Sequence, residues 1–247
     1  LGSQGSCAPP SLPTTFRASS PGKHPMPAKP HAAPSPRTRA RRLSEKAAYD
    51  RATVEAILDA MPVAHVGYVL DGAPVVTPTL QWREGDRIYW HGSSASRMQR
   101  KSAAAQVCVT VTLTDGMLLA RSGLEHSVNY RCVMVFGEAV EVTDPEAKAE
   151  HLRVMMEQMF PGRWATLRPM TAQELKATAI LSLPISEASA KISAGMPLDP
   201  PEDQSWPVWA GVLPIELTMG APIPAPDMPE GIAAPDYLRA YRFGVKP

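Results

Sequence analysis

The pattern of apolar and polar positions along the chain predicts a mainly β protein with a few helices. Apolar and polar residues alternate with a period of two in several short runs, and turn-forming residues separate these runs. The expected strands are residues 63–70, 73–82, 87–91, 106–113, 129–142, 179–185 and 209–217. Short strands joined by tight turns are typical of a closed or partly closed antiparallel barrel.

Two Asp-Gly pairs mark the sharpest expected turns. Asp71-Gly72 separates two alternating runs and predicts a hairpin, because both residue types tolerate the left-handed backbone that such turns need. Asp115-Gly116 is interpreted in the same way. In the strand after the first turn, Pro74 and Pro78 cannot donate ladder hydrogen bonds. We therefore expect that strand at a sheet edge, a bulge or a barrel rim.

Helical patterns lie before the first strand and after the fifth. Residues 44–61 are expected to form one helix or a broken pair, because Val54, Ile57, Leu58 and Met61 follow i, i+3, i+4, i+7 spacing. Thr53 is the expected N-cap. An Asp-Pro pair opens a second expected helix over residues 144–160. Residues 171–174 match a capping box and predict the start of a short helix or turn.

Composition divides the chain into three parts. Residues 1–42 contain no Asp or Glu, seven Lys or Arg and few large apolar side chains, so we expect a disordered basic tail. Residues 43–220 form the expected folded domain, and residues 221–247 form a Pro-rich extension. Beyond the tail, 18 basic and 24 acidic residues remain. This acidic balance argues against nucleic-acid binding by the folded domain.

The sequence also indicates where in the cell the protein is expected. It contains no run of 18 apolar residues, so no membrane span is expected. Three cysteines do not suggest a disulfide framework, and a cytoplasmic location is predicted. Cys108 and Cys132 lie in strand-like runs and are interpreted as buried small side chains. We expect translation to start at Met26, with a transit peptide as the alternative interpretation of the tail.

The strongest indication of a ligand comes from residues 88–101. An apolar strand leads into a Gly-Ser-Ser-Ala-Ser loop and then into a helical segment with Arg97, Arg100 and Lys101. Unpaired N–H groups and the positive dipole end at a helix start favour a phosphate. Ser96 is equally well interpreted as a simple N-cap, with the basic residues forming a solvated helix face.

Other catalytic or metal chemistry is weakly indicated. The sequence contains no Gly-x-Ser-x-Gly elbow, no Gly-x-Gly-x-x-Gly and no Walker loop. Glu125 and His126 are adjacent, but no third ligand follows at a suitable spacing, so no metal site is expected.

Four motifs follow one another in a recognisable order. They are Val75–Thr79, Tyr89–Ser93 with Ser96-Arg97, Asn129–Gly137 and Trp209–Pro214. Together they resemble the flavin-nucleotide-binding branch of the pyridoxamine 5′-phosphate oxidase-like family, close to the nitroimidazole-resistance proteins. The resemblance covers roughly residues 45–220. It implies a six-stranded antiparallel split β-barrel with Greek-key character and flanking helices, forming a homodimer that binds FMN at the subunit interface.

The resemblance also implies the residues of the FMN site. Those expected along the isoalloxazine edge are Thr77, Pro78 and Thr79. Those expected along the ribityl chain are His91, Gly92 and Ser93. Those expected at the phosphate are Ser96, Arg97 and Lys101. Those expected to approach the flavin from the partner subunit are Tyr130, Arg131 and Trp209.

The chain departs from the pyridoxamine oxidases proper. Met98 stands where they carry a Lys, and the Ala-Gly-Val after Trp209 lacks their arginine, so pyridoxamine phosphate is not the expected substrate. We expect an FMN-dependent oxidoreductase acting on a small organic substrate, with the flavin supplying the redox chemistry and no catalytic side chain. Two alternatives stay open. One is a flavin carrier or sensor without turnover, and the other is a haem-binding or haem-degrading protein with His65, His91 or His126 as axial ligand.

Overall fold

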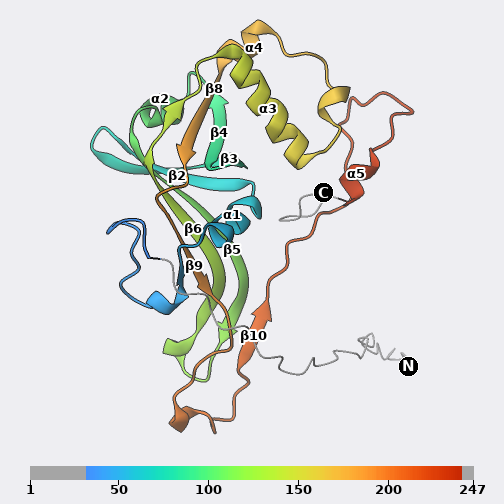
Figure 1. Cartoon of the computed structure of the whole chain (residues 1–247). Helices are drawn as coiled ribbons and strands as arrows, with labels where there is room; N and C mark the ends of the chain where they lie inside the picture. The colour runs from blue at the N-terminus through green and yellow to red at the C-terminus, as the bar shows by residue number, and fades with distance from the viewer. Residues whose placement is uncertain (1–31, 241–247) are drawn as a thin grey trace, which may run out of the picture.

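A ten-stranded antiparallel sheet dominates the computed structural model, which describes residues 32–240 (Figure 1). The sheet has the order β1-β9-β6-β5-β2-β3-β4-β8-β7, and β10 pairs with β5. The strands are β1 Ala47–Ala48, β2 Val63–Leu70, β3 Ala73–Glu84, β4 Arg87–Ser93, β5 Gln106–Leu119, β6 Ser127–Glu138, β7 Val140–Glu141, β8 Thr178–Pro184, β9 Ala188–Ser193 and β10 Gly211–Pro214. The expected mainly β class is confirmed. The described residues form ten strands, more than the six that the family resemblance implied.

The additional strands leave weak signals in the sequence. β1 contains two residues, too few to show an alternation. β7 lies inside residues 129–142, which were expected to form one strand and instead form β6 and β7. β9 reads Ala-Ser-Ala-Lys-Ile-Ser, and most of its buried side chains are too small to mark a hydrophobic pattern. Ala188 and Ala190 nevertheless belong to the core, because β9 lies between β1 and β6 in the sheet.

The first predicted hairpin is confirmed, and the second is wrong. β2 and β3 pair along their whole shared length, with Asp71 and Gly72 at φ of 50° and 81° in the turn. Asp115 and Gly116 lie inside β5, where the register with β6 shifts between Thr114 and Gly116. An Asp-Gly pair therefore closes the β2–β3 hairpin at residues 71–72, but forms a bulge within β5 at residues 115–116.

The two prolines of β3 lie on a free edge, as expected. β3 pairs with β2 over residues 73–80 but with β4 only over residues 81–84. Along residues 73–80, one edge of β3 consequently has no strand partner within the described part of the chain. Such an edge tolerates the missing N–H groups of Pro74 and Pro78.

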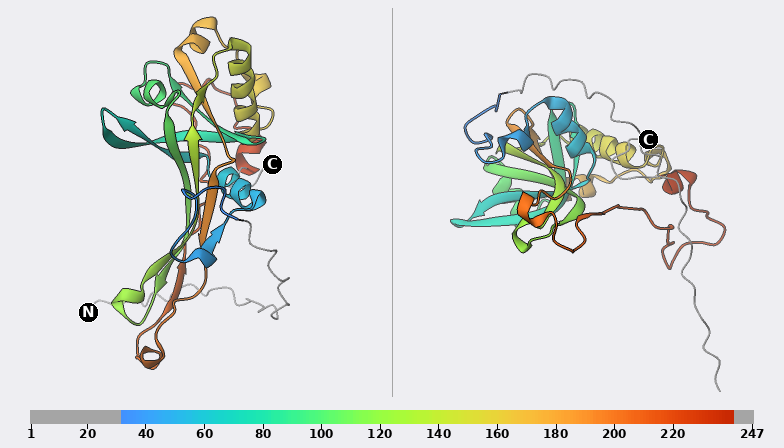
Figure 2. Two further views of the ribbon diagram at one scale, coloured as in Figure 1. Left: turned by 60° about the vertical axis from the view of Figure 1, so that its left-hand side comes forward. Right: turned by 90° about the horizontal axis from the view of Figure 1, so that it is seen from below.

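Five α-helices accompany the sheet over residues 32–240. They are α1 Arg51–Asp59, α2 Arg97–Ser102, α3 Pro145–Met159, α4 Ala172–Ala177 and α5 Asp236–Ala240. Short 3₁₀ turns are η1 Ser44–Lys46, η2 Gly123–Glu125, η3 Trp164–Thr166 and η4 Pro201–Asp203. Figure 2 shows α3 and α4 at one end of the elongated molecule and the β5–β6 hairpin reaching to the other. None of the helices described is long and apolar enough to span a bilayer.

Helix starts agree with the sequence at two of three expected positions. Asp144 caps α3 by accepting from the N–H of Ala147, and the capping box of residues 171–174 opens α4. For α1 the N-cap is Asp50, whose carboxylate accepts from the N–H of Thr53 at 2.8 Å. Thr53 is therefore the third residue of α1 and not its cap, because the stronger carboxylate acceptor precedes it.

Two cores hold the layers together. The larger one packs α1 against the sheet and contains Leu58, Trp90 and Val109, all fully buried. The smaller one lies beneath α3 around Trp82 and Tyr89. Because successive side chains of a strand point to opposite faces, β4 supplies Trp90 to one core and Tyr89 to the other.

Part of the predicted tail and of the extension is described. Arg37 forms an ion pair with Glu187, its guanidinium lies 5.2 Å from the ring centroid of Phe136, and Thr38 is buried. These contacts tie residues 37–38 to the sheet. Most of the predicted tail, including Met26, lies outside the described residues.

Candidate functional site

The structure brings the first three groups of predicted flavin residues to one corner of the sheet. We call residues 77–79, 91–93 and 96–102 the β3–β4 corner. Thr79 lies at the free edge of β3, and its hydroxyl donates to the carbonyl oxygen of His91 at 3.5 Å. β4 ends at Ser93, and α2 begins four residues later. A free strand edge thus lies beside the start of a basic helix.

Ser96 takes the N-cap position of α2 without acting as a side-chain cap. Its backbone is extended, and its hydroxyl makes no hydrogen bond to the first turn of the helix. The loop is closed by other contacts, since the N–H of Ser96 donates to the Ser93 carbonyl at 2.9 Å. The N–H of Ala95 donates to the Ser93 hydroxyl at 3.2 Å. The simple-cap interpretation of Ser96 is confirmed in its position and in the exposed basic face of α2, but the Ser96 hydroxyl makes no capping hydrogen bond.

The cations of α2 divide into two kinds. Lys101 forms an exposed ion pair with Asp71 in the β2–β3 turn, at 3.7 Å. Arg97 and Arg100 are exposed, and neither makes an ion pair with another described residue. The two guanidiniums are thus placed to take an anion from solvent, whereas Lys101 already has an acidic neighbour in Asp71.

Buried polar atoms without a hydrogen-bond partner occur in and beside this corner, on both faces of β4. Among the residues described, such atoms occur on Trp90, His91, Gln99 and Ser102 here, and on Gln81, Arg121 and Asn129 elsewhere. Gln99 is 2% exposed, and both of its amide atoms lack a partner. A buried polar group left unpaired costs roughly 1–3 kcal/mol, so this corner is suited to a polar ligand or to water.

Three of these residues are not among those predicted from the sequence. Trp90 is predicted only as a strand residue. In the segment that forms α2, the prediction uses only the basic residues and Ser96, and not Gln99 or Ser102. A signal was present, because Gln99 and Ser102 are three positions apart and hence lie on one face of the helix. Gly92 leaves the room for Gln99, since a Cβ at residue 92 would lie 2.6 Å from the Gln99 Nε2.

His91 is the half-buried titratable group of the corner. Its Nδ1 is buried without a partner, and its ring lies 6.0 Å from the Trp82 ring between centroids. Burial lowers the pKa of His91 below its usual value, because desolvation disfavours the imidazolium. The ring is therefore neutral near pH 7, the form that binds metal ions.

The fourth group of predicted residues lies elsewhere in the sheet. Tyr130 and Arg131 are on β6, which β5 and β2 separate from β3. Arg131 donates to both carboxylate oxygens of Asp115, and this hydrogen bonding raises the pKa of Arg131. Trp209 is 65% exposed just before β10, with its ring over Gly211. Within one chain, the structure does not bring this group to the β3–β4 corner.

Two further histidines were candidates for an axial ligand. His65 is exposed on β2, in register with Pro78 and Thr110. His126 has its Nδ1 2.9 Å from the carbonyl oxygen of Ser122. It borders an apolar groove of about 480 Å³, lined also by Met117, Leu118, Leu119, Ser127, Val128 and Leu213.

Other groups in the described residues offer little chemistry. Cys108 and Cys132 are half-buried where full burial was expected, and burial raises the pKa of both thiols. No cluster of three or more His, Cys, Asp or Glu that could hold a metal ion occurs in residues 32–240.

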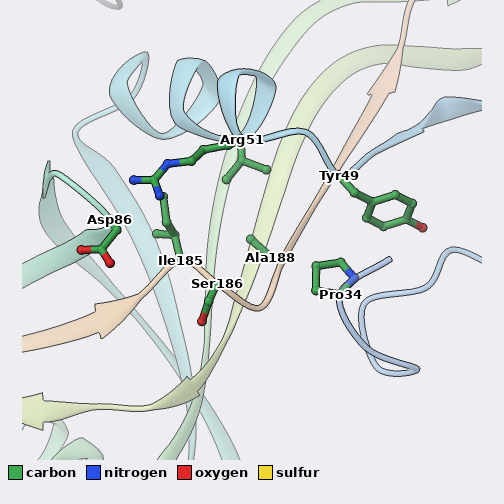
Figure 3. A pocket seen from close by; sticks show the side chains of 8 residues that line it. Pro34, Tyr49, Arg51, Asp86, Ile185, Ser186 and Ala188 are labelled. Atoms are coloured by element: carbon green, nitrogen blue, oxygen red, sulfur yellow. The ribbon is translucent and has the colours of Figure 1, made fainter. Parts of the chain in front are cut away.

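A separate cavity of about 210 Å³ lies between the N-terminal segment, α1 and the β8–β9 turn (Figure 3). The residues that line it are Pro34, Tyr49, Arg51, Val54, Asp86, Ile185, Ser186 and Ala188. None of them was predicted as a site residue. Its one cation, Arg51, already pairs with Glu55 at 2.5 Å, so we do not place the functional site here.

The chain is similar to two solved structures over most of its length. The chain is 46% identical to the flavocytochrome Anf3 from Azotobacter vinelandii, with a TM-score of 0.83 over 85% of this chain and 99% of that one. It is 38% identical to an FAD and heme binding protein from Mycobacterium smegmatis, with a TM-score of 0.76 over 79% of this chain and 97% of that one. A search of curated proteins finds no significant match.

A family model described as pyridoxamine 5′-phosphate oxidase matches residues 50–192, which include β2 to β8, α1 to α4 and nearly all of β9. The matched segment contains the whole β3–β4 corner and amounts to more than half of the chain. On this match and on the two similar structures, the chain belongs to the pyridoxamine 5′-phosphate oxidase family.

Proposed function

We propose that this chain is a redox protein that binds both a flavin and a haem. Support comes from its likeness, over nearly their entire lengths, to a flavocytochrome and to an FAD and heme binding protein. The proposal joins the flavin interpretation of the sequence with its haem alternative. Flavins and haems supply the electron chemistry themselves, so the protein needs to supply position and electrostatics.

The β3–β4 corner fits the flavin. The free edge of β3 at residues 77–79 offers backbone groups to a planar ring system, and the hydroxyl of Ser96 is not used as a cap. Arg97 and Arg100 are exposed cations beside it. We propose FAD in place of the expected FMN, because the relative whose flavin is specified binds FAD. The two guanidiniums suit a pyrophosphate, which takes bidentate hydrogen bonds from arginine.

His91 carries the haem part of the proposal. Its ring is neutral near pH 7, and its buried Nδ1 has no partner. A neutral imidazole with a free nitrogen is the ligand that haem iron takes from a histidine. His126 and His65 are more exposed than His91. We therefore assign the axial position to His91 first.

A homodimer is part of the proposal. Val63, Val69, Val76 and Met134 are exposed apolar side chains, and the registers of β2, β3, β5 and β6 place them on one face of the sheet with His65. We call these five residues the outer face. A second copy on this face would bury it, and could bring Tyr130, Arg131 and Trp209 to the first copy's corner.

Absorbance spectroscopy of the purified protein tests this function. We expect flavin bands together with a Soret band, and release of FAD, distinguished from FMN by mass. His91→Ala should lose or shift the Soret band and keep the flavin bands, while His65→Ala and His126→Ala, as matched controls, should leave it unchanged.

Three results would overturn parts of the proposal. A protein without any chromophore after reconstitution with FAD and haemin would refute it. A Soret band lost only in His126→Ala or His65→Ala would move the axial ligand away from His91. Release of FMN in place of FAD would refute the FAD part of the proposal and agree with the FMN expected from the sequence.

A further inference from the structure

Trp82 on β3 donates a short hydrogen bond from its indole to an acidic side chain. Its Nε1–H lies 2.6 Å from Glu84 Oε1, two positions further along the same face of the strand. The indole is 3% exposed, and a hydrogen bond from an N–H to a carboxylate is charge-assisted and strong. All five tryptophans lie within the described residues, and only Trp82 has such an acceptor for its indole.

Glu84 also has a partner on the helix that covers the smaller core. The Nδ1 of His151 on α3 lies 2.9 and 3.0 Å from the two carboxylate oxygens, so a proton on Nδ1 is donated to Glu84. Figure 1 shows α3 beside β4 and β8. The side chains of Glu84 and His151 are both 21% exposed. Glu84 therefore links a buried indole to an imidazole that solvent reaches.

Ring contacts extend from Trp82 in two directions. Toward the β3–β4 corner, its ring lies 6.0 Å from the ring of His91 between centroids. Toward α3, it stacks on Tyr89 with centroids 5.7 Å apart and 19° between the planes. The Tyr89 ring in turn lies 4.4 Å from the ring of His151. These separations are those of aromatic rings in direct contact, so the four rings form one series from the corner to α3.

Within this series Trp82 is the side chain best placed to give up an electron. Loss of an electron makes the indole N–H strongly acidic, and a base already within hydrogen-bond reach takes the proton without any movement of the chain. Glu84 is such a base for Trp82. Burial raises the pKa of Tyr89, so its hydroxyl keeps its proton. Trp90, on the opposite face of β4, has a buried Nε1 without a partner.

We propose that Trp82 quenches a light-excited flavin at the β3–β4 corner by giving it one electron, while Glu84 takes the indole proton. The Nε1–H bond of Trp82 breaks, an O–H bond forms on Glu84, and a neutral radical remains on the indole. The flavin gains the electron. Return of the electron to Trp82 and of the proton from Glu84 restores both side chains, so the cycle consumes no other reactant. The proposal rests on the proposed function, because the oxidant is the flavin placed at the corner.

Blue-light illumination of the full-length, flavin-loaded protein tests the proposal. Samples are frozen under light and examined by electron paramagnetic resonance, and ring-deuterated tryptophan supplied during expression identifies an indole radical by its altered hyperfine pattern. We expect this radical in the wild type. Trp82→Phe should lose it, and the bound flavin of this variant should bleach faster. Trp164→Phe is the matched control and should match the wild type, because Trp164 packs against the same core but gives its backbone N–H, and not its indole, to the carboxylate of Glu157.

Glu84→Gln tests the proton step separately. The amide oxygen of glutamine still accepts a hydrogen bond from the indole but is not a base. The neutral radical should therefore be lost from this variant, although Trp82 is still present. If Trp82→Phe does not fold, Glu84→Gln decides, and an unchanged neutral radical in it would overturn the proposal.

The remaining outcomes separate this proposal from the proposed function. A wild-type protein that carries flavin but forms no indole radical under light would overturn the role of Trp82 and leave the flavin assignment intact. A radical that persists in Trp82→Phe would also overturn it. A protein that binds no flavin would refute the proposed function, and the role of Trp82 with it.

Discussion

The guanidinium of Arg131 on β6 donates two hydrogen bonds to the carboxylate of Asp115 on β5, one of 2.9 Å from Nε and one of 2.7 Å from Nη2. Asp115 lies at the bulge where the β5–β6 register shifts, one residue before the segment that pairs with β10. The pair therefore stabilises the bulge. The pair occupies Nε and Nη2 of Arg131, and Nη1 takes no part in it.

Replacing Asp115 by asparagine should destabilise the fold by about 0.5–1 kcal/mol. Both partners are more than one-third exposed, so solvent screens the pair, and only its bidentate geometry places it at the upper end for surface pairs. Chemical denaturation of Asp115→Asn, Arg131→Gln and the double variant measures the coupling. A coupling free energy near zero would show that the bulge is held by the backbone alone.

Removing the guanidinium of Arg97 should weaken flavin binding. Loss of one charge-assisted hydrogen bond costs about 1.5–3 kcal/mol, which corresponds to roughly a 10- to 150-fold higher dissociation constant. Flavin titration of Arg97→Ala, followed by fluorescence, measures this change. Arg153→Ala is the matched control, because Arg153 is exposed on α3 and pairs only locally with Glu150. Equal affinities in the two variants would place the phosphates elsewhere.

The fold could be predicted where side chains alternate clearly, and only there. β2 was placed correctly from Val63 to Leu70, because its apolar residues alternate and its hairpin turn is marked by Asp71-Gly72. Asp115-Gly116 carries the same local signal and forms a bulge. The difference is tertiary, since β5 continues past it to pair with β10 and β6.

The site could be predicted in part for a related reason. Residues such as His91 and Arg97 stand out by chemical type, so the sequence drew attention to them. Gln99 became visible only when its burial was known, because an amide on a short helix is ordinarily exposed. Whether Trp209 approaches a cofactor depends on a second chain, which no pattern within one sequence can place.

The stability of the cofactor-free protein should fall as the pH drops below about 6.5, the usual pKa of histidine, partly through His91. Burial lowers the pKa of His91 in the folded state, so the unfolded chain binds a proton that the folded chain resists. Unfolding free energies from about pH 5 to about pH 7 should therefore rise with pH. In His91→Gln this slope should be smaller, and an identical slope would mean that other groups cause it.

Glu174 should titrate far below an ordinary glutamate. Its pKa is lowered to about 2, first by hydrogen bonds from Arg168 and then by the N–H and hydroxyl of Thr171. The capping box of α4 should therefore stay formed as the pH falls through about 4.5, and should be lost only near the lowered value. NMR titration of the carboxyl carbon in wild type and Arg168→Ala checks this. The variant should show a higher pKa, and an unchanged pKa would assign the shift to Thr171 alone.

Gly116 should tolerate no side chain, because β10 passes directly over it. A Cβ at this position would lie 2.9 Å from Val212 Cγ1 and 3.0 Å from the carbonyl oxygen of Leu213. The second contact is with backbone, so relief requires moving β10 away from β5. Gly116→Ala should destabilise the chain by about 1–3 kcal/mol in denaturant unfolding. Gly123→Ala is the matched control, since nothing lies within 4 Å of its Cβ position. If Gly116→Ala is as stable as this control, β10 is not held on β5 in solution.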